Sequence, residues 1–221
     1  MGTEGNGSNG ETGLVDGDVA ELPPAPAEVQ ELAEACVAYV ERSLKIRLDF
    51  TPETLPLLDH WMRDRRKDVG VSKDDIMALV AAPAGAYLGE VARRVLRLRW
   101  FAPPGDYRRW RIELENVFLS MNPIGAAVEA LLMQEAENWG ASFRMRPEDK
   151  EHAKAVLANL GEVELEEYYA PSNRLEMLHI IADALMRKEY GEDEPIAKYG
   201  ADDYGPLRAE AIGAIEEEGE N

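Results

Sequence analysis

The side-chain period changes from helical to strand-like within one short stretch of this 221-residue chain, residues 85–115. The stretch opens with Gly85-Ala86-Tyr87-Leu88-Gly89-Glu90 and runs into an arginine-rich helix end. After a Pro-Pro-Gly turn, residues 109–115 alternate strictly between polar and apolar side chains. A period of two is typical of a half-buried strand. The stretch therefore predicts a helix followed by an antiparallel hairpin over residues 97–115.

The alternation also predicts which hairpin side chains face the core. Trp110 shares a strand face with Ile112 and Leu114, so we expect it to be buried. Arg109 and Arg111 fall on the opposite face with the glutamates of the same strand, and we expect this face to point outward.

Apolar residues at helical spacing predict six helices around the hairpin. Thr51-Pro52 and Asn122-Pro123 mark two of the starts, because proline lacks the N–H that goes unpaired in a first helical turn. Pro83 lies inside one pattern and predicts a kink or a break there. The predicted helices cover residues 26–44, 52–66, 72–95, 122–138, 147–161 and 172–190.

Two further segments have strand-like patterns. Residues 141–145 predict a short strand, and residues 46–50 predict either an edge strand or an extended link. Together the elements predict an α+β fold, with five or six helices around a small antiparallel sheet centred on the hairpin 97–115. We expect a single globular domain over residues 27–190.

The acidity of the chain is concentrated at its ends. The formal net charge is −19, but residues 1–28 hold six acids and no base, and residues 189–221 hold eleven acids and two bases. Residues 1–26 have few large apolar side chains and predict a disordered acidic tail. Residues 191–221 predict a second acidic tail with repeated Tyr-Gly pairs, which either stays solvated or folds onto a partner or back onto the domain.

Several functional classes lose support from composition alone. Acidic ends repel nucleic acids and anionic membranes, so we expect neither as a partner. The single cysteine, Cys36, has no partner for an internal disulfide and falls on an apolar helix face. No apolar run approaches the roughly 18 residues of a membrane span, and the N-terminus has no signal-peptide pattern. We therefore expect a cytoplasmic protein.

The order of these features resembles that of a family of uncharacterised bacterial domains. The resemblance rests on the Leu48-Asp49-Phe50-Thr51-Pro52-Glu53 segment, the Gly85-Ala86-Tyr87-Leu88-Gly89-Glu90 helix, the Trp100 strand and the Asn122-Pro123 helix start. It covers roughly residues 45–135. The family has no agreed activity, so the resemblance implies an architecture and not a function.

Glu90 is the one acid in the distinctive helix block, one turn after Tyr87. A catalytic carboxylate needs a partner acid, a histidine or a metal nearby, and the sequence indicates none. We expect Glu90 to be structural and to pair with an arginine of the hairpin, since a partly buried carboxylate must be paired. The alternative is a small-molecule enzyme with a site at Tyr87, Glu90 and Arg94.

These observations favour non-enzymatic protein binding, as an adaptor or regulator. No HExxH, CxxC, P-loop, GxGxxG or GxSxG motif occurs, and we expect no metal and no cofactor. We expect the partner to be another protein, and one version of this prediction is a basic protein; the sequence does not indicate the oligomeric state. A second alternative is nucleic-acid binding through the arginines of residues 93–111. The candidate partner-binding residues are Arg93, Arg97, Arg99, Arg108, Arg109, Arg111, Tyr199 and Tyr204.

Overall fold

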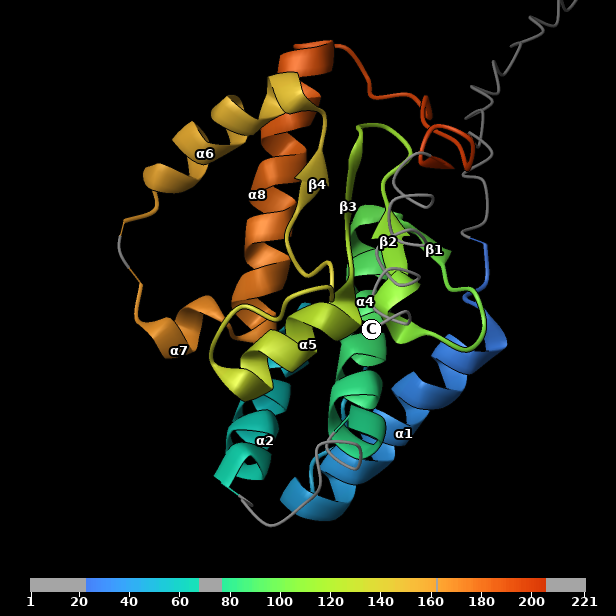
Figure 1. Ribbon diagram of the computed structural model, residues 1–221, viewed down its shortest axis with the longest axis vertical. Helices are drawn as coiled ribbons and strands as arrows, with labels where there is room; N and C mark the ends of the chain where they lie inside the picture. Colours follow the sequence, from blue (N-terminus) through green and yellow to red (C-terminus); the bar gives the residue numbers. More distant parts are fainter. Residues whose placement is uncertain (1–22, 68–76, 162, 206–221) are drawn as a thin grey trace, which may run out of the picture.

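The computed structural model describes residues 23–67, 77–161 and 163–205. Within these residues, seven α-helices and a four-stranded antiparallel sheet form an α+β fold, which confirms the predicted fold class (Figure 1). Each of the six predicted helices is present in part, and α7 is an additional single turn. The helix predicted over 122–138 is shorter than expected, because the backbone of Met133 takes a left-handed conformation that ends it at Leu132. The helices are α1 (Ala27–Leu44), α2 (Leu55–Lys67), α4 (Ala82–Leu96), α5 (Pro123–Leu132), α6 (Lys150–Ala158), α7 (Leu165–Tyr168) and α8 (Pro171–Tyr190).

The sheet has the strand order β1-β2-β3-β4. In β1 and β2, Trp100 lies opposite Ile112, so the hairpin predicted over 97–115 is present. Ser120 of β3 lies opposite Arg144 of β4. The strand predicted at 141–145 is thus a two-residue strand, while residues 46–50 form no strand and link α1 to the turn before α2. The strands are β1 (Arg99–Phe101), β2 (Arg111–Glu113), β3 (Leu119–Met121) and β4 (Arg144–Met145).

Helix α4 lies at the centre of the molecule, with α1 on one side and the α6–α8 layer on the other (Figure 1). Its two glycines allow neighbours to approach its backbone. A Cβ at Gly85 would lie 2.4 Å from the Cα of Ile124 in α5, and one at Gly89 would lie 2.2 Å from the Trp100 ring. The spacing of these glycines therefore sets how closely α5 and the hairpin pack on α4.

Two helix starts behave as the sequence predicts. The backbone changes from a π-helix, η2 (Met77–Ala81), to α4 at Ala82, which places Pro83 in the first turn where it costs no hydrogen bond. Asn122 caps α5, because its side-chain oxygen accepts the N–H groups of Ile124 and Gly125. Short 3₁₀ turns precede or follow other elements: η1 (Pro52–Thr54), η3 (Tyr107–Arg109) and η4 (Pro147–Asp149).

The outward orientation predicted for the polar face of β2 is wrong. Trp110 is buried as expected, but Arg111 and Glu113 are buried as well. Glu113 accepts hydrogen bonds from Arg111 Nε at 3.0 Å and from Arg99 Nη2 at 3.2 Å. Pairing offsets the cost of removing these charges from water, which is why a polar strand face can be buried.

Residues 192–205 run back over the domain from the end of α8, and we call this segment the C-terminal strap. The backbone N–H groups of Lys198 and Tyr199 both donate to the Glu115 carbonyl, at 2.7 and 2.8 Å. The predicted tail beyond residue 190 thus lies on the domain as far as residue 205. Residues 206–221 and 1–22, on which the rest of the tail predictions fall, lie outside the described residues.

None of the helices in the described ranges combines the length and the apolarity needed to cross a membrane.

Candidate functional site

The Glu90 carboxylate lies inside the molecule and is only 3% exposed. One oxygen accepts hydrogen bonds from Arg93 Nε and Trp100 Nε1, both at 2.8 Å, and the other accepts one from Arg93 Nη2 at 2.9 Å. Arg94 Nη2 lies 3.8 Å away. Glu90 is therefore paired, as expected, but the main partner is an arginine of its own helix and not one of the hairpin. The hairpin contributes a tryptophan instead.

The Tyr87 side chain lies in the core and contacts the segment that connects α1 to α2. Its hydroxyl accepts the N–H of Phe50 at 2.9 Å and lies 2.7 Å from the Thr54 hydroxyl. Its ring stacks on Phe50, with ring centroids 4.9 Å apart. Burial raises the pKa of Tyr87, although its hydrogen bonds with Thr54 and Phe50 act in the other direction. Tyr87 therefore has a structural role.

A cavity of about 240 Å³ lies beside Glu90, Arg93 and Arg94. Arg94 covers the Phe50 ring, with its guanidinium carbon 4.1 Å from the ring centroid. The structure thus brings Glu90 and Arg94 of the predicted trio to one cavity, whereas Tyr87 does not line it. All of the hydrogen bonds of Glu90 described above are made to side chains that hold it in place.

The six arginines predicted to contact a partner do not form one exposed cluster. Arg93 is buried against Glu90, and its Nη1 also donates to the Pro23 carbonyl at 2.9 Å. Arg111 is buried against Glu113. Arg99 and Arg109 are partly buried, and Arg99 bridges two glutamates of the hairpin. Arg97 and Arg108 are the two exposed members of the set.

The two tyrosines predicted to contact a partner lie in the strap and bind the domain itself. Tyr204 is fully buried, so in this structure it contacts the domain and is not exposed to a partner. Its hydroxyl donates to the Leu114 carbonyl at 2.8 Å and accepts the Leu119 N–H at 3.0 Å, and its ring stacks on Phe118. Burial raises the pKa of Tyr204 well above its usual range. The residue closes the connection between β2 and β3.

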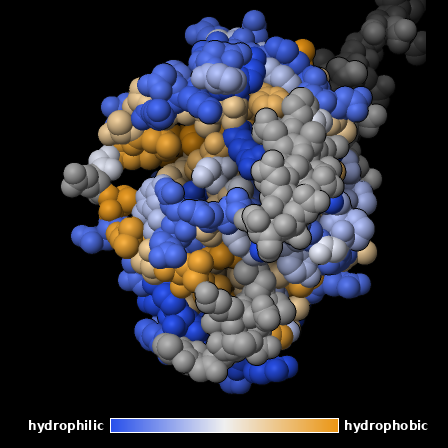
Figure 2. Space-filling model, in the orientation of Figure 1, coloured by the Kyte–Doolittle hydropathy of each residue, from blue (hydrophilic) through white to orange (hydrophobic). Residues whose placement is uncertain are grey.

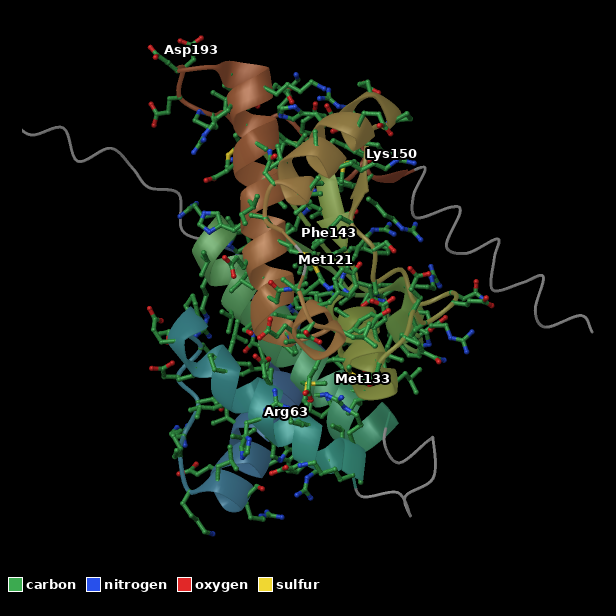
Figure 3. All side chains as sticks on the ribbon, turned by 90° about the vertical axis from the view of Figure 1, so that its left-hand side faces the viewer. Arg63, Met121, Met133, Phe143, Lys150 and Asp193 are labelled. Atoms are coloured by element: carbon green, nitrogen blue, oxygen red, sulfur yellow. The ribbon has the colours of Figure 1, made fainter. Side chains whose placement is uncertain are left out.

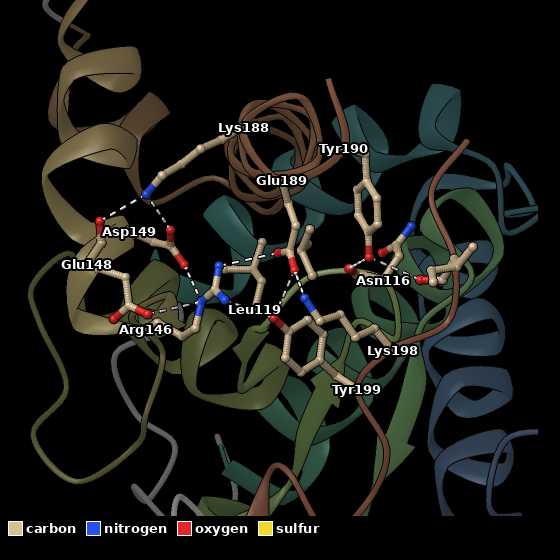
Figure 4. Close-up of polar contacts among 12 residues, drawn as sticks. Asn116, Leu119, Arg146, Glu148, Asp149, Lys188, Glu189, Tyr190, Lys198 and Tyr199 are labelled. Atoms are coloured by element: carbon tan, nitrogen blue, oxygen red, sulfur yellow. Dashed lines mark hydrogen bonds and ion pairs between the residues drawn. The ribbon is translucent and has the colours of Figure 1, made fainter. Parts of the chain in front are cut away.

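Tyr199 belongs to a charged network that joins the strap to α8 and to the start of α6 (Figure 4). Its hydroxyl accepts from Arg146 Nη1 at 3.0 Å. Arg146 Nε and Lys188 Nζ each donate to the buried Asp149 carboxylate at 2.7 Å. Glu189 binds both Arg146 and Lys198. Cations and acids alternate in this network, so they neutralise one another.

An open groove lies between α6, α7 and the first turns of α8, and sequence reasoning missed it. Its volume is about 390 Å³, within the range of ligand-binding clefts. Figure 2 shows apolar side chains gathered there, with the surface hollowed between α6 and α7. Figure 3 looks onto this side of the molecule, where Phe143 is labelled. The apolar walls of the groove include Phe143, Leu157, Leu160, Val163, Tyr168 and Met177.

The groove exists because α6 and α7 lie apart. Helix α6 packs on α8, but it ends at Ala158, and Gly161 then takes a positive φ of 83°. The chain returns to α8 only at the single turn α7. The available sequence signal was a set of large apolar residues on both sides of Gly161, the end of the helix predicted over 147–161. Periodicity can place such residues in a helix but does not show which element packs against them, so it did not point to a groove.

Comparisons with known proteins give no match: no protein-family model, no curated protein and no solved structure is similar to this chain. The resemblance to bacterial domains stays a prediction. Across the described ranges, no three histidine, cysteine, aspartate or glutamate side chains gather as a metal site requires.

Proposed function

We propose that the protein acts by binding, and that it receives an apolar, basic segment of another protein in the groove between α6, α7 and α8. The observation that carries this proposal is the exposure of large apolar side chains on the groove's rim. Leu160 is 50% exposed and Leu165 58% exposed, and Val163 and Tyr168 lie close to them in sequence and are exposed as well. Contiguous apolar surface beside a cleft is typical of an interaction site, whereas scattered single residues are not.

The charges around the groove favour a basic partner. Glu164 directly precedes α7, Glu167 lies in α7, and Glu176 lines the groove. All three are exposed and make no ion pair with a described residue. Glu166, by contrast, is paired with Arg63 at 2.7 Å. Unpaired acids on a rim attract lysine and arginine side chains and raise the rate of association. A helix with an apolar face and basic flanks combines both requirements.

The state of Glu90 supports binding over catalysis. A general acid or base must be able to reach a substrate proton. The Glu90 oxygens are instead hydrogen-bonded to Arg93 and Trp100 inside the molecule. The arginines of residues 93–111 give nucleic-acid binding little support for a similar reason, since Arg93, Arg99 and Arg111 are paired with glutamates.

The test uses a fluorescent model peptide of about 18 residues, built from leucine and lysine as an amphipathic helix. We expect it to bind at least about tenfold more tightly than the same peptide with glutamate in place of lysine, because the rim is acidic. Fluorescence anisotropy at physiological salt gives both affinities.

The matched variants are Leu160→Asp and Leu132→Asp. Both leucines are 50% exposed, but Leu132 ends α5 and does not line the groove. Leu160→Asp should weaken peptide binding by about tenfold or more, the value of one apolar anchor, and Leu132→Asp should leave it unchanged. Equal effects of the two variants, or no binding of the basic peptide, would reject the groove as the binding site.

A further inference from the structure

The floor of the groove carries a guanidinium that lies between two aromatic rings. Arg174, in the first turn of α8, lines the groove, and its side chain is only 5% exposed. The guanidinium carbon lies 5.6 Å from the ring centroid of Phe143 and 5.6 Å from that of Tyr168. Two aromatic rings thus hold the cation in place at the bottom of the cleft.

One buried donor of Arg174 has no hydrogen-bond partner. A guanidinium has five N–H donors. Nη2 donates to Glu129 Oε2 at 2.9 Å, and Glu129 uses its other oxygen for the Ala136 N–H. The buried Nε of Arg174 has no hydrogen-bond partner. Because buried donors are nearly always satisfied, an unsatisfied one at the floor of a cleft suggests that a ligand supplies the acceptor.

Two further polar groups lie beside Arg174. Asn173 and Ser142 line the same groove and bring an amide and a hydroxyl to it, and both groups can donate hydrogen bonds to a carboxylate. The N-terminus of α8 is already occupied, because the N–H and the hydroxyl of Ser172 donate to the Asp59 carboxylate. The positive charge at the groove therefore comes from Arg174.

The size of the groove indicates how much of a partner enters it. One helical turn with its side chains is about 10–12 Å wide and 5.4 Å high, so it fills on the order of 400–600 Å³. The groove of about 390 Å³ therefore holds about one turn, which suits the end of a segment better than the middle of one. The last turn of a basic helix brings apolar and basic side chains together with its terminal carboxylate.

We propose that Arg174 receives the C-terminal carboxylate of the bound segment, whose last apolar side chains contact the walls of the groove. This inference rests on the proposed function. The guanidinium then donates to the incoming carboxylate as well as to Glu129, and the basic side chains of the segment meet the glutamates on the rim. Hydrogen bonds between ionised groups are stronger than neutral ones, so the end of the chain becomes a main determinant of affinity.

Glu129 competes with the incoming carboxylate for Arg174. A variant without the Glu129 charge should therefore bind the carboxylate more tightly. Two carboxylates at one guanidinium repel each other. Glu129→Gln keeps the shape of the side chain and removes the competing charge. We expect Glu129→Gln to bind a peptide with a free C-terminal carboxylate at least about threefold more tightly than the wild type. Its affinity for the amidated peptide should not change.

The experiment compares the leucine–lysine peptide as the free acid and as the C-terminal amide, by fluorescence anisotropy with the full-length protein. The wild type should prefer the acid by about tenfold or more. Arg174→Gln should abolish this preference. Arg187→Gln is the control, because Arg187 lies on the same helix with a side chain 81% exposed, and it should keep the preference. If Arg174→Gln does not fold, the acid–amide comparison and Glu129→Gln decide the question.

Each outcome separates this inference from the proposed function. If acid and amide bind equally well, the carboxylate inference is wrong and the groove proposal stands. If neither peptide binds, the groove proposal is wrong and the inference fails with it. A Glu129→Gln variant that does not gain affinity for the acid contradicts the role of Arg174. If decanoate binds as tightly as the acid peptide, the groove binds a small apolar carboxylate, and the inference that it receives the end of a protein chain is wrong.

Discussion

Burial decides whether the Glu90 side chain has a catalytic or a structural role. It lies on a helix beside two glycines, a setting that suits a catalytic acid as well as a structural one. In the structure it holds Arg93 and Trp100 together inside the core. A buried ion pair adds little net stability over an apolar pair, but removal of one partner leaves an uncompensated charge. Glu90 is therefore needed as long as Arg93 is present.

The substitution Glu90→Gln should lower the free energy of unfolding by about 3 kcal/mol, because it leaves the Arg93 guanidinium buried without its counter-charge. Urea unfolding followed by tryptophan fluorescence measures the change. Glu148→Gln is the control, since the Glu148 side chain is 64% exposed, and it should change the value by less than about 0.5 kcal/mol. A loss below about 1 kcal/mol for Glu90→Gln would show that Arg93 is satisfied without it.

At the scale of elements, the distance between α4 and its neighbours depends on glycine. Gly85 faces the backbone of α5 at Ile124, and Gly89 faces the Trp100 ring of β1. Gly125 in α5 similarly faces the carbonyl oxygen of Trp139, 2.4 Å from where a Cβ would lie. The helices and the hairpin therefore pack backbone against backbone or ring, which a larger residue prevents.

We predict that Gly85→Ala destabilises the protein although alanine favours helix formation. The gain in helix propensity is about 1 kcal/mol. The added Cβ would lie 2.4 Å from the backbone of Ile124, which cannot move aside like a flexible side chain, and overpacking of this kind costs typically 1–3 kcal/mol or more. Thermal unfolding should show a net loss of several degrees. Gly200→Ala is the control, because the nearest atom to the added Cβ would lie 3.7 Å away, and it should leave the stability unchanged. A Gly85→Ala variant as stable as the wild type would contradict the close approach of the two helices.

At the scale of the whole molecule, the C-terminal strap closes the structure. Tyr204 joins residues that are 85 to 90 positions away in sequence, and the charged network of Figure 4 ties the strap to α8 and α6. Asp149 lies at one end of this network and is 1% exposed. Burial alone raises the pKa of Asp149, but the hydrogen bonds from Arg146 and Lys188 outweigh it and hold that pKa below its usual value.

The pKa of Asp149 predicts acid-sensitive stability. A carboxyl whose pKa is lower in the folded state contributes stability above its unfolded pKa of about 3.9, and this contribution is lost as the pH falls through the folded pKa. Asp149→Asn should therefore cost about 2 kcal/mol at pH 7 and should flatten the fall of stability below about pH 4. Chemical unfolding between pH 2.5 and 7 measures both. The exposed Asp193→Asn should keep the wild-type profile, and an unchanged acid slope in Asp149→Asn would contradict the assignment.

Local features of the sequence were enough to determine the elements and the fold class. The helical periods, the alternation before Leu114 and the Asn122 cap each involve residues within one or two turns of one another. The physics that stabilises them is equally local: a cap satisfies N–H groups two or three residues on, and a period states which side chains share a face. The hairpin, the break at Pro83 and the core position of Trp110 follow from such rules.

Only the tertiary structure decided which polar residues are buried and where the surface opens. Arg174 donates to Glu129, 45 residues away in sequence, and Ser172 donates to Asp59, 113 residues away. A side-chain pattern identifies a face but not the element that packs against it. Arg111, Glu113 and Tyr204 were therefore expected at the surface, but they are buried. The groove between α6 and α8 exists because no described element fills it, and it had no sequence pattern of its own.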